Sequence, residues 1–173
     1  MEQYRKTPRA CFLSYDEGDF FITICIRDRK HHFGEIENNV MHYSETGLFC
    51  FSELEKASQY NPKIKIPVFT VMPNHIHFVI HLEKDDMEEE NIEHRNPNPS
   101  LRPKIDSKRK VALLSKYVSS LKGSVTKFAK AKGIDLKWQG RYHDHYIRGP
   151  HDGNNISEYI VNNVYRWESD CFI

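Results

Sequence analysis

The chain has 173 residues, about the length of one domain. Apolar residues make up 39% of it and aromatic residues 12%, enough for a sizeable core, which excludes wholesale disorder. The first residues lack the apolar stretch of a signal peptide, and no segment has the pattern of a membrane span. The four cysteines are scattered with no Cys-x-x-Cys pair, so the sequence suggests neither a disulfide framework nor a thiolate zinc site. We expect a cytoplasmic protein with no membrane partner.

A net charge of +1 conceals a segregation of charge along the chain. Residues 83–93 hold seven acidic residues against one lysine, whereas residues 101–132 hold ten basic residues against one aspartate. This asymmetry indicates a polyanionic partner; the alternative is a solvated loop followed by a lysine-rich helix surface. We interpret residues 83–110, which combine the acidic run with several prolines, as a flexible charged insertion in a single domain over residues 1–173.

Hydrophobic periodicity predicts alternating strands and helices. In chain order we expect a strand at 20–26, a helix at 44–60 capped by Ser44, strands at 68–72 and 75–82 joined at Pro73-Asn74, a helix at 111–132, an extended segment at 136–148 and a last helix from about Asn155. This order predicts an α+β protein with a ferredoxin-like sandwich, in which helices cover one face of an antiparallel sheet and a C-terminal helix follows.

Two histidines are candidate metal ligands. His75 and His77 lie two apart in a predicted strand, so both imidazoles point to one face while Ile76 and Phe78 point to the other. Two neutral imidazoles held on a rigid strand form a partial site for a divalent cation. A polar strand face exposed to water is the alternative interpretation.

A second pair of candidates lies in the last predicted helix. Tyr159 and Asn163 are four residues apart, which places them on one helical face. A tyrosine hydroxyl can act as a nucleophile, and an amide oxygen is a ligand that suits magnesium or manganese. Considered alone, Tyr159 is also compatible with a structural role in the core or at an interface.

Three sequence blocks resemble a known family. The segment Met72-Pro73-Asn74-His75-Ile76-His77 is similar to the MPNHhH signature, with h an apolar residue, of the single-tyrosine transposases of the HUH superfamily (insertion-sequence 200-like transposases). Residues 138–148 resemble the family's WQ-containing strand, and residues 158–163 resemble the YI..NP block of its nucleophile helix, with Val164 in place of the usual proline. The opening strand, followed by Arg27-Asp28-Arg29, resembles the subgroup of REP-associated tyrosine transposases.

The resemblance implies a chemistry and a role for each of these residues. His75, His77 and Asn163 would bind a divalent metal ion, Mg²⁺ or Mn²⁺, and Tyr159 would attack a phosphodiester of single-stranded DNA that contains a hairpin. The product would be a 5′-phosphotyrosine link that allows later strand transfer. It also implies a nucleoid-associated location and allows a homodimer.

Candidate DNA contacts come from basic and aromatic residues: Lys116, Lys122, Lys127, Arg148 and Tyr142. Trp138 could also stack on bases, although packing in the core explains it better. Two alternatives to a transposase are an HUH nickase of the replication-initiator or relaxase type and a non-catalytic ferredoxin-like module that binds nucleic acid. A histidine-rich metal sensor that does not bind DNA is a third.

Overall fold

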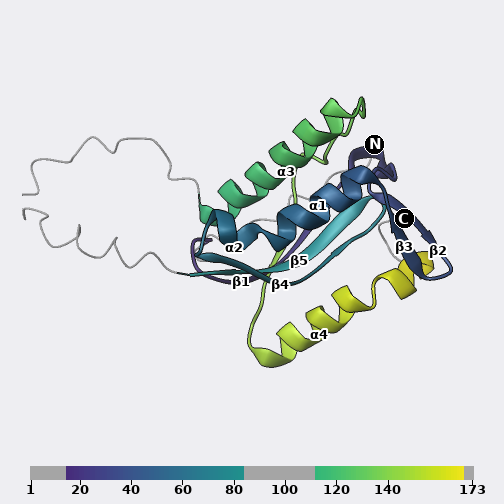
Figure 1. Cartoon of the computed structure of the whole chain (residues 1–173). Helices are drawn as coiled ribbons and strands as arrows, with labels where there is room; N and C mark the ends of the chain where they lie inside the picture. Colours follow the sequence, from purple (N-terminus) through teal and green to yellow (C-terminus); the bar gives the residue numbers. More distant parts are fainter. Residues whose placement is uncertain (1–14, 84–111, 170–173) are drawn as a thin grey trace, which may run out of the picture.

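A computed structural model describes residues 15–83 and 112–169 of the chain. Their framework is a four-stranded antiparallel sheet in the order β4-β5-β1-β6 (Figure 1). The strands are β1 (Gly18–Cys25), β4 (Ile64–Val71), β5 (His75–Leu82) and β6 (His143–Tyr146). With helices between β1 and β4 and between β5 and β6, this order is that of a ferredoxin-like fold, so the predicted α+β sandwich is confirmed. The predicted insertion at 83–110 lies outside the described residues, except for Glu83.

The two central strands pair along their whole length. In β1 and β5, Cys25 lies opposite His75 and Gly18 opposite Leu82. Successive side chains alternate between the two faces of the sheet. Ile76, Phe78 and Ile80 are fully buried in the hydrophobic core, which leaves the alternate β5 residues for the opposite face.

Two helices cover the core face of the sheet, as Figure 1 shows. They are α1 (Glu45–Glu55), which is followed by the short α2 (Ala57–Tyr60), and α3 (Leu113–Ala131). The α3 residues Leu114, Val118, Leu121, Val125 and Ala129 recur at helical spacing and are all buried in the core. The Ser44 side chain accepts a hydrogen bond from the Gly47 N–H at 3.1 Å, so the predicted N-cap is confirmed.

The last helix lies on the opposite face of the sheet (Figure 1). This helix, α4 (Pro150–Val161), contacts β4 and β5 and is followed by the 3-10 helix η3 (Val164–Ser169). The expected start near Asn155 was wrong. Proline at the first helical turn needs no N–H partner, and the Asp152 carboxylate accepts a hydrogen bond from the Arg148 N–H at 2.9 Å, so the helix begins at Pro150.

A second hairpin was not predicted. It consists of β2 (Gly34–Glu37) and β3 (Val40–Tyr43), which pair only with each other. The residues at its tip, Asn38 and Asn39, both have positive φ, at 51° and 60°. Asparagine tolerates this conformation, and two such residues between short extended runs form the turn of a tight hairpin. The Asn-Asn pair was the available signal.

The aromatic segment before α4 is less regular than expected. Only His143–Tyr146 forms a strand, whereas Trp138 makes an isolated bridge to Ile26. The Trp138 indole N–H donates to the Lys122 carbonyl and the Thr126 hydroxyl of α3. Trp138 therefore packs between sheet and helix, as the preferred interpretation predicted.

Candidate active site

His75 and His77 of β5 are buried on the sheet face that α4 covers. His75 is 0% exposed and His77 1%, and their ring centroids lie 4.5 Å apart. The predicted alternation is confirmed, because both rings point away from the core face that holds Ile76 and Phe78. They do not form a polar face exposed to water, which was the alternative.

Each imidazole is oriented by a polar neighbour through its Nδ1 atom. His75 Nδ1 lies 2.7 Å from Asn74 Oδ1, and because that oxygen can only accept, the imidazole N–H donates. His77 Nδ1 lies 2.8 Å from Thr23 Oγ1 on the paired strand. Hydrogen bonds of this kind fix ring orientation in metal-ligating histidines. At His75, where Nδ1 carries the proton, Nε2 is the nitrogen that presents a lone pair.

Burial keeps both rings neutral. Removal from water lowers the pKa of His77 well below its usual 6.5. It also lowers the pKa of His75, to which the charges of His77 and Arg29 add a smaller effect in the same direction. Neutral imidazole is the form that binds a metal ion.

Tyr159 projects from α4 toward these histidines. Its hydroxyl lies 3.3 Å from His77 Nε2, although the two residues are 82 positions apart in the chain. The Tyr159 ring also packs edge-on against Phe21 of β1, with centroids 6.1 Å apart. Contact with Phe21, which itself stacks on His77, holds the ring over the sheet.

Asn163 lies beyond the end of the helix rather than on it. The helix α4 ends at Val161, so the argument from a shared helical face holds only approximately. Asn163 is 1% exposed, and no described residue hydrogen bonds to its Oδ1. A buried amide oxygen of this kind is costly unless a ligand satisfies it.

This donor set fits a divalent cation. Two neutral imidazoles and one amide oxygen are acceptable ligands for Mn²⁺ or Mg²⁺. Within the described residues 15–83 and 112–169, no group of three or more His, Cys, Asp or Glu side chains is arranged to hold a metal ion, so a site here would need the amide. The residues that the sequence predicted as ligands therefore have suitable chemistry.

Two residues of the site were missed by sequence reasoning. Thr23 was read only as part of an apolar strand, although a single hydroxyl inside that run was a signal. Trp167 of η3 stacks on the His75 ring, with centroids 6.2 Å apart and planes 24° apart. Its contact with His75 depends on the path of the chain after α4, for which the sequence offered no pattern.

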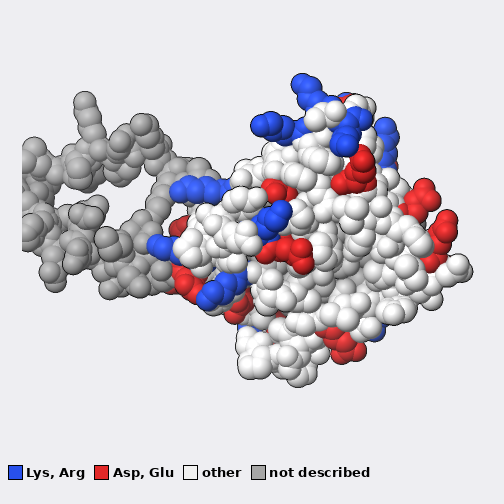
Figure 2. All heavy atoms as spheres, viewed as in Figure 1, with Lys and Arg blue, Asp and Glu red and all other residues white. Residues whose placement is uncertain are grey.

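The predicted lysine contacts lie on the other side of the sheet from Tyr159. Lys116 and Lys127 are exposed on α3, which packs on the core face. Figure 2 shows basic side chains gathered at the C-terminal end of α3, where the sequence holds Lys127, Lys130 and Lys132. Lys122 is half-buried and donates to the Gln139 carbonyl at 3.0 Å. Its ammonium group therefore stabilises the fold, and it is less available for a DNA contact than the exposed lysines.

Tyr142 and Arg148 occupy different environments. The Tyr142 ring packs against the core, and its hydroxyl lies 3.2 Å from Ser115 Oγ of α3. Arg148 is exposed directly before α4, the helix that carries Tyr159. Of the two, Arg148 is the better placed for a strand bound at Tyr159.

Two other tyrosines near the C-terminal end of the chain, Tyr146 and Tyr165, lie outside this arrangement. Tyr146 packs edge-on against the buried Phe20, on the core side of the sheet. Tyr165 of η3 is 69% exposed to solvent. Tyr159 alone of these three has its hydroxyl against a β5 histidine.

Comparison with known proteins places the chain in a family. It is 30% identical, over 169 residues, to a protein of Haemophilus influenzae (strain Rd) named "Uncharacterized protein", with coverage of 96% of this chain and 92% of that protein. The chain belongs to the same family as this protein. No protein-family model matches the sequence.

A solved structure of a REP-associated tyrosine transposase bound to a REP hairpin is similar in fold. The TM-score is 0.58 at 19% sequence identity, and the match covers 96% of this chain and 74% of that one. The likeness shows that the two proteins share a fold.

Proposed function

We propose that the chain is a tyrosine transposase of the HUH type, which cleaves single-stranded DNA and transfers the strand with Tyr159 as nucleophile. The observation that carries this proposal is the 3.3 Å contact between the Tyr159 hydroxyl and His77 Nε2. A phenol, two neutral imidazoles and a buried amide oxygen are the groups that phosphoryl transfer by this route requires.

The chain's own residues prepare the site in three ways. Asn74 and Thr23 orient the imidazoles, burial keeps both rings neutral, and Phe21 holds the Tyr159 ring. A divalent cation bound by His75, His77 and Asn163 would polarise the non-bridging oxygens of the scissile phosphate.

The reaction conserves both bonds and protons. The Tyr159 oxygen forms a bond to phosphorus as the bond from phosphorus to the 3′-oxygen breaks. The phenol releases one proton and the leaving 3′-oxygen takes up one. Because the phosphotyrosine keeps the phosphodiester energy, a 3′-hydroxyl can later reverse the step without ATP.

We infer that the substrate contains a hairpin. The transposase of similar fold is bound to a REP hairpin. In this chain, Arg148 lies exposed at the start of the nucleophile's helix, where it could contact the backbone of the strand. A substrate of this kind also implies a nucleoid-associated location.

The test is formation of a covalent adduct. The full chain is incubated with Mn²⁺ and labelled single strands taken from the flanks of its own gene, and adducts are separated under denaturing conditions. We expect an adduct that maps by peptide sequencing to Tyr159. Tyr159→Phe should form none while still binding the strand, and Tyr165→Phe, a matched control on the exposed η3, should behave as the parent.

Two outcomes would decide against the proposal. Strand binding without any adduct would favour a non-catalytic nucleic-acid-binding module. An adduct at Tyr146 or Tyr165 would keep the nuclease and overturn the mechanism.

A further inference from the structure

A cavity of about 400 Å³ lies between α4 and the sheet face that carries the histidines. Its walls combine the apolar side chains of Pro67, Val79 and Ile147 with the polar groups of Asp19, Asn154 and Ser157. Apolar walls with a few convergent polar groups are typical of sites for small organic ligands, and the volume is in the range of such sites.

The cavity borders the candidate active site. Val79 is the next residue after His77 on this face of β5, about 7 Å along the strand. Ser157 lies two residues before Tyr159 in α4, about 3 Å along the helix axis and on another side of the helix. A strand whose phosphate is held at Tyr159 would therefore place a nearby nucleotide, about one or two residues away, at the mouth of the cavity.

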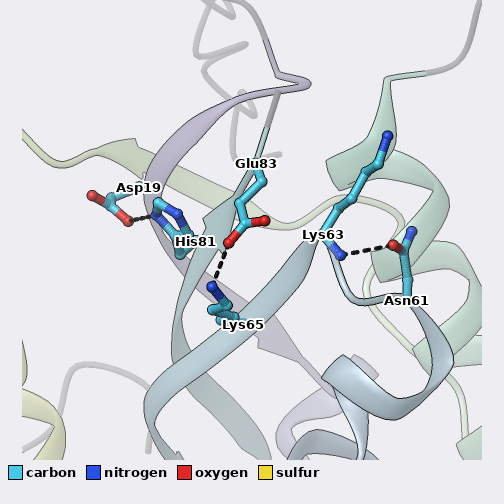
Figure 3. Close-up of polar contacts among 6 residues, drawn as sticks. All are labelled: Asp19, Asn61, Lys63, Lys65, His81 and Glu83. Atoms are coloured by element: carbon cyan, nitrogen blue, oxygen red, sulfur yellow. Dashed lines mark hydrogen bonds and ion pairs between the residues drawn. The ribbon is translucent and has the colours of Figure 1, made fainter. Parts of the chain in front are cut away.

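The charges at the cavity favour a neutral occupant with N–H donors. Among the described residues that line it there is no Lys or Arg, and Asp19 is its one ionisable side chain. One carboxylate oxygen of Asp19 accepts a hydrogen bond from His81 Nδ1, at 2.8 Å. The other oxygen points away from His81 (Figure 3). The nearby Lys65 is paired with Glu83. A phosphate would meet a carboxylate here with no Lys or Arg in the lining, whereas a donor-bearing ring would meet an acceptor.

We propose that this cavity binds one unpaired nucleobase of the substrate strand and that Asp19 selects the base. The apolar walls fit the faces of a planar ring, and Asp19 accepts hydrogen bonds from its edge. Guanine offers two adjacent N–H donors to a carboxylate, whereas the one ring N–H of thymine lies between two carbonyl oxygens that repel it. The binding order is therefore guanine first and thymine last. This proposal rests on the proposed function for its substrate class.

The test measures binding of single bases without any cleavage. Methyl NMR spectra of the full chain are recorded during titration with each of the four deoxynucleoside monophosphates at millimolar concentration. The Val79 and Ile147 methyl signals should shift, most with deoxyguanosine monophosphate and least with thymidine monophosphate. Asp19→Asn should weaken guanine binding by about tenfold or more, the range for a hydrogen bond to a charged group.

His81→Gln is the matched control, because it removes the imidazole beside Asp19 and leaves the carboxylate in the cavity. It should keep the guanine preference. The order of the four nucleotides on the parent chain is itself decisive, should Asp19→Asn fail to fold. Absent shifts, equal shifts for guanine and thymine, or an undiminished preference in a folded Asp19→Asn would overturn the proposal.

The readouts separate this proposal from the proposed function. Adduct formation at Tyr159 without base-dependent shifts would leave the nuclease standing and remove the base site. Base-dependent shifts without an adduct on any strand would leave a base-binding cavity in a protein that is not this nuclease.

Discussion

At the scale of single residues, the candidate chemistry depends on His75 and His77. We predict that the double variant His75→Ala, His77→Ala loses Mn²⁺-dependent adduct formation. Because a ligand that binds only the folded state adds about 2.7 kcal/mol of stability at a hundred times its dissociation constant, Mn²⁺ should also raise the thermal midpoint of the parent and not that of the variant. The comparison needs both proteins folded, which circular dichroism checks. Cleavage at the parent rate by the variant would refute the ligand assignment.

The burial of these two imidazoles also predicts an effect of pH on stability. Their pKa values are lowered in the folded protein, so the unfolded chain binds more protons below pH 6.5. Stability conferred by the neutral rings is present above pH 6.5 and is lost as the pH falls below it, by up to about 1.4 kcal/mol per pH unit for each histidine.

Urea denaturation of the chain in EDTA, at pH 7, 6 and 5, measures this effect. Replacement of His77 by Gln should reduce the slope of unfolding free energy against pH by about half. A slope that His77→Gln leaves unchanged would show that other groups control acid unfolding.

At the scale of secondary-structure elements, two helical glycines are present for different reasons. At one of them the packing leaves no room for a side chain, and at the other a side chain would fit. A Cβ at Gly47, in the first turn of α1, would lie 2.0 Å from the Phe33 carbonyl oxygen, whereas a Cβ at Gly123, inside α3, would meet nothing within 4 Å. We expect Gly47→Ala to lower the unfolding free energy by at least about 2 kcal/mol. Gly123→Ala should raise it by roughly 0.5–1 kcal/mol, because alanine favours the helix. Chemical denaturation of the two variants should show these opposite signs.

The lysines of α3 test which face of the sheet would contact DNA under the proposed function. Exposed lysines that neutralise phosphates of a single strand each contribute about 0.7 to the slope of log affinity against log salt. If α3 binds DNA, as its charge predicts, Lys116→Gln with Lys127→Gln should reduce this slope by about 1.4. An unchanged slope, with a reduced one for Arg148→Gln, would assign the contact to the α4 side.

Lys122 provides an internal control for that experiment. Its ammonium group donates to backbone carbonyls before β6. Lys122→Met should therefore cost stability and leave the salt dependence nearly unchanged.

At the scale of the whole molecule, the sequence predicted the features that follow from short hydrophobic periods, namely strand alternation and helical spacing. Alternation along β5 was enough to separate His75 and His77 from the core side chains, and helical spacing was enough to identify the buried side of α3. Both patterns arise from local backbone geometry, so they are visible in a single sequence.

What the sequence did not predict depends on contacts between distant segments. The orienting Thr23 and the stacked Trp167 reach the histidines only because β1 pairs with β5 and the chain turns back after α4. Lys122 is a candidate DNA contact in the sequence, because nothing in the sequence indicates its carbonyl partners, which lie in a segment with no periodic pattern. The hairpin at Asn38-Asn39 is the exception, because its turn chemistry is local and the Asn-Asn pair signals it in the sequence.

The opposite facing of neighbouring β5 side chains has a consequence for how this family can diverge. One set of β5 side chains packs in the core: Ile76, Phe78 and Ile80. The alternate set faces α4: His75, His77 and Val79. Selection for folding therefore acts on the first set and selection for the site acts on the second. Under the proposed function, a lineage that lost DNA cleavage could change His75 and His77 while Ile76, Phe78 and Ile80 stayed apolar. Relatives in which the core residues are kept and the histidines are substituted would then identify the branches that retain the fold without the activity.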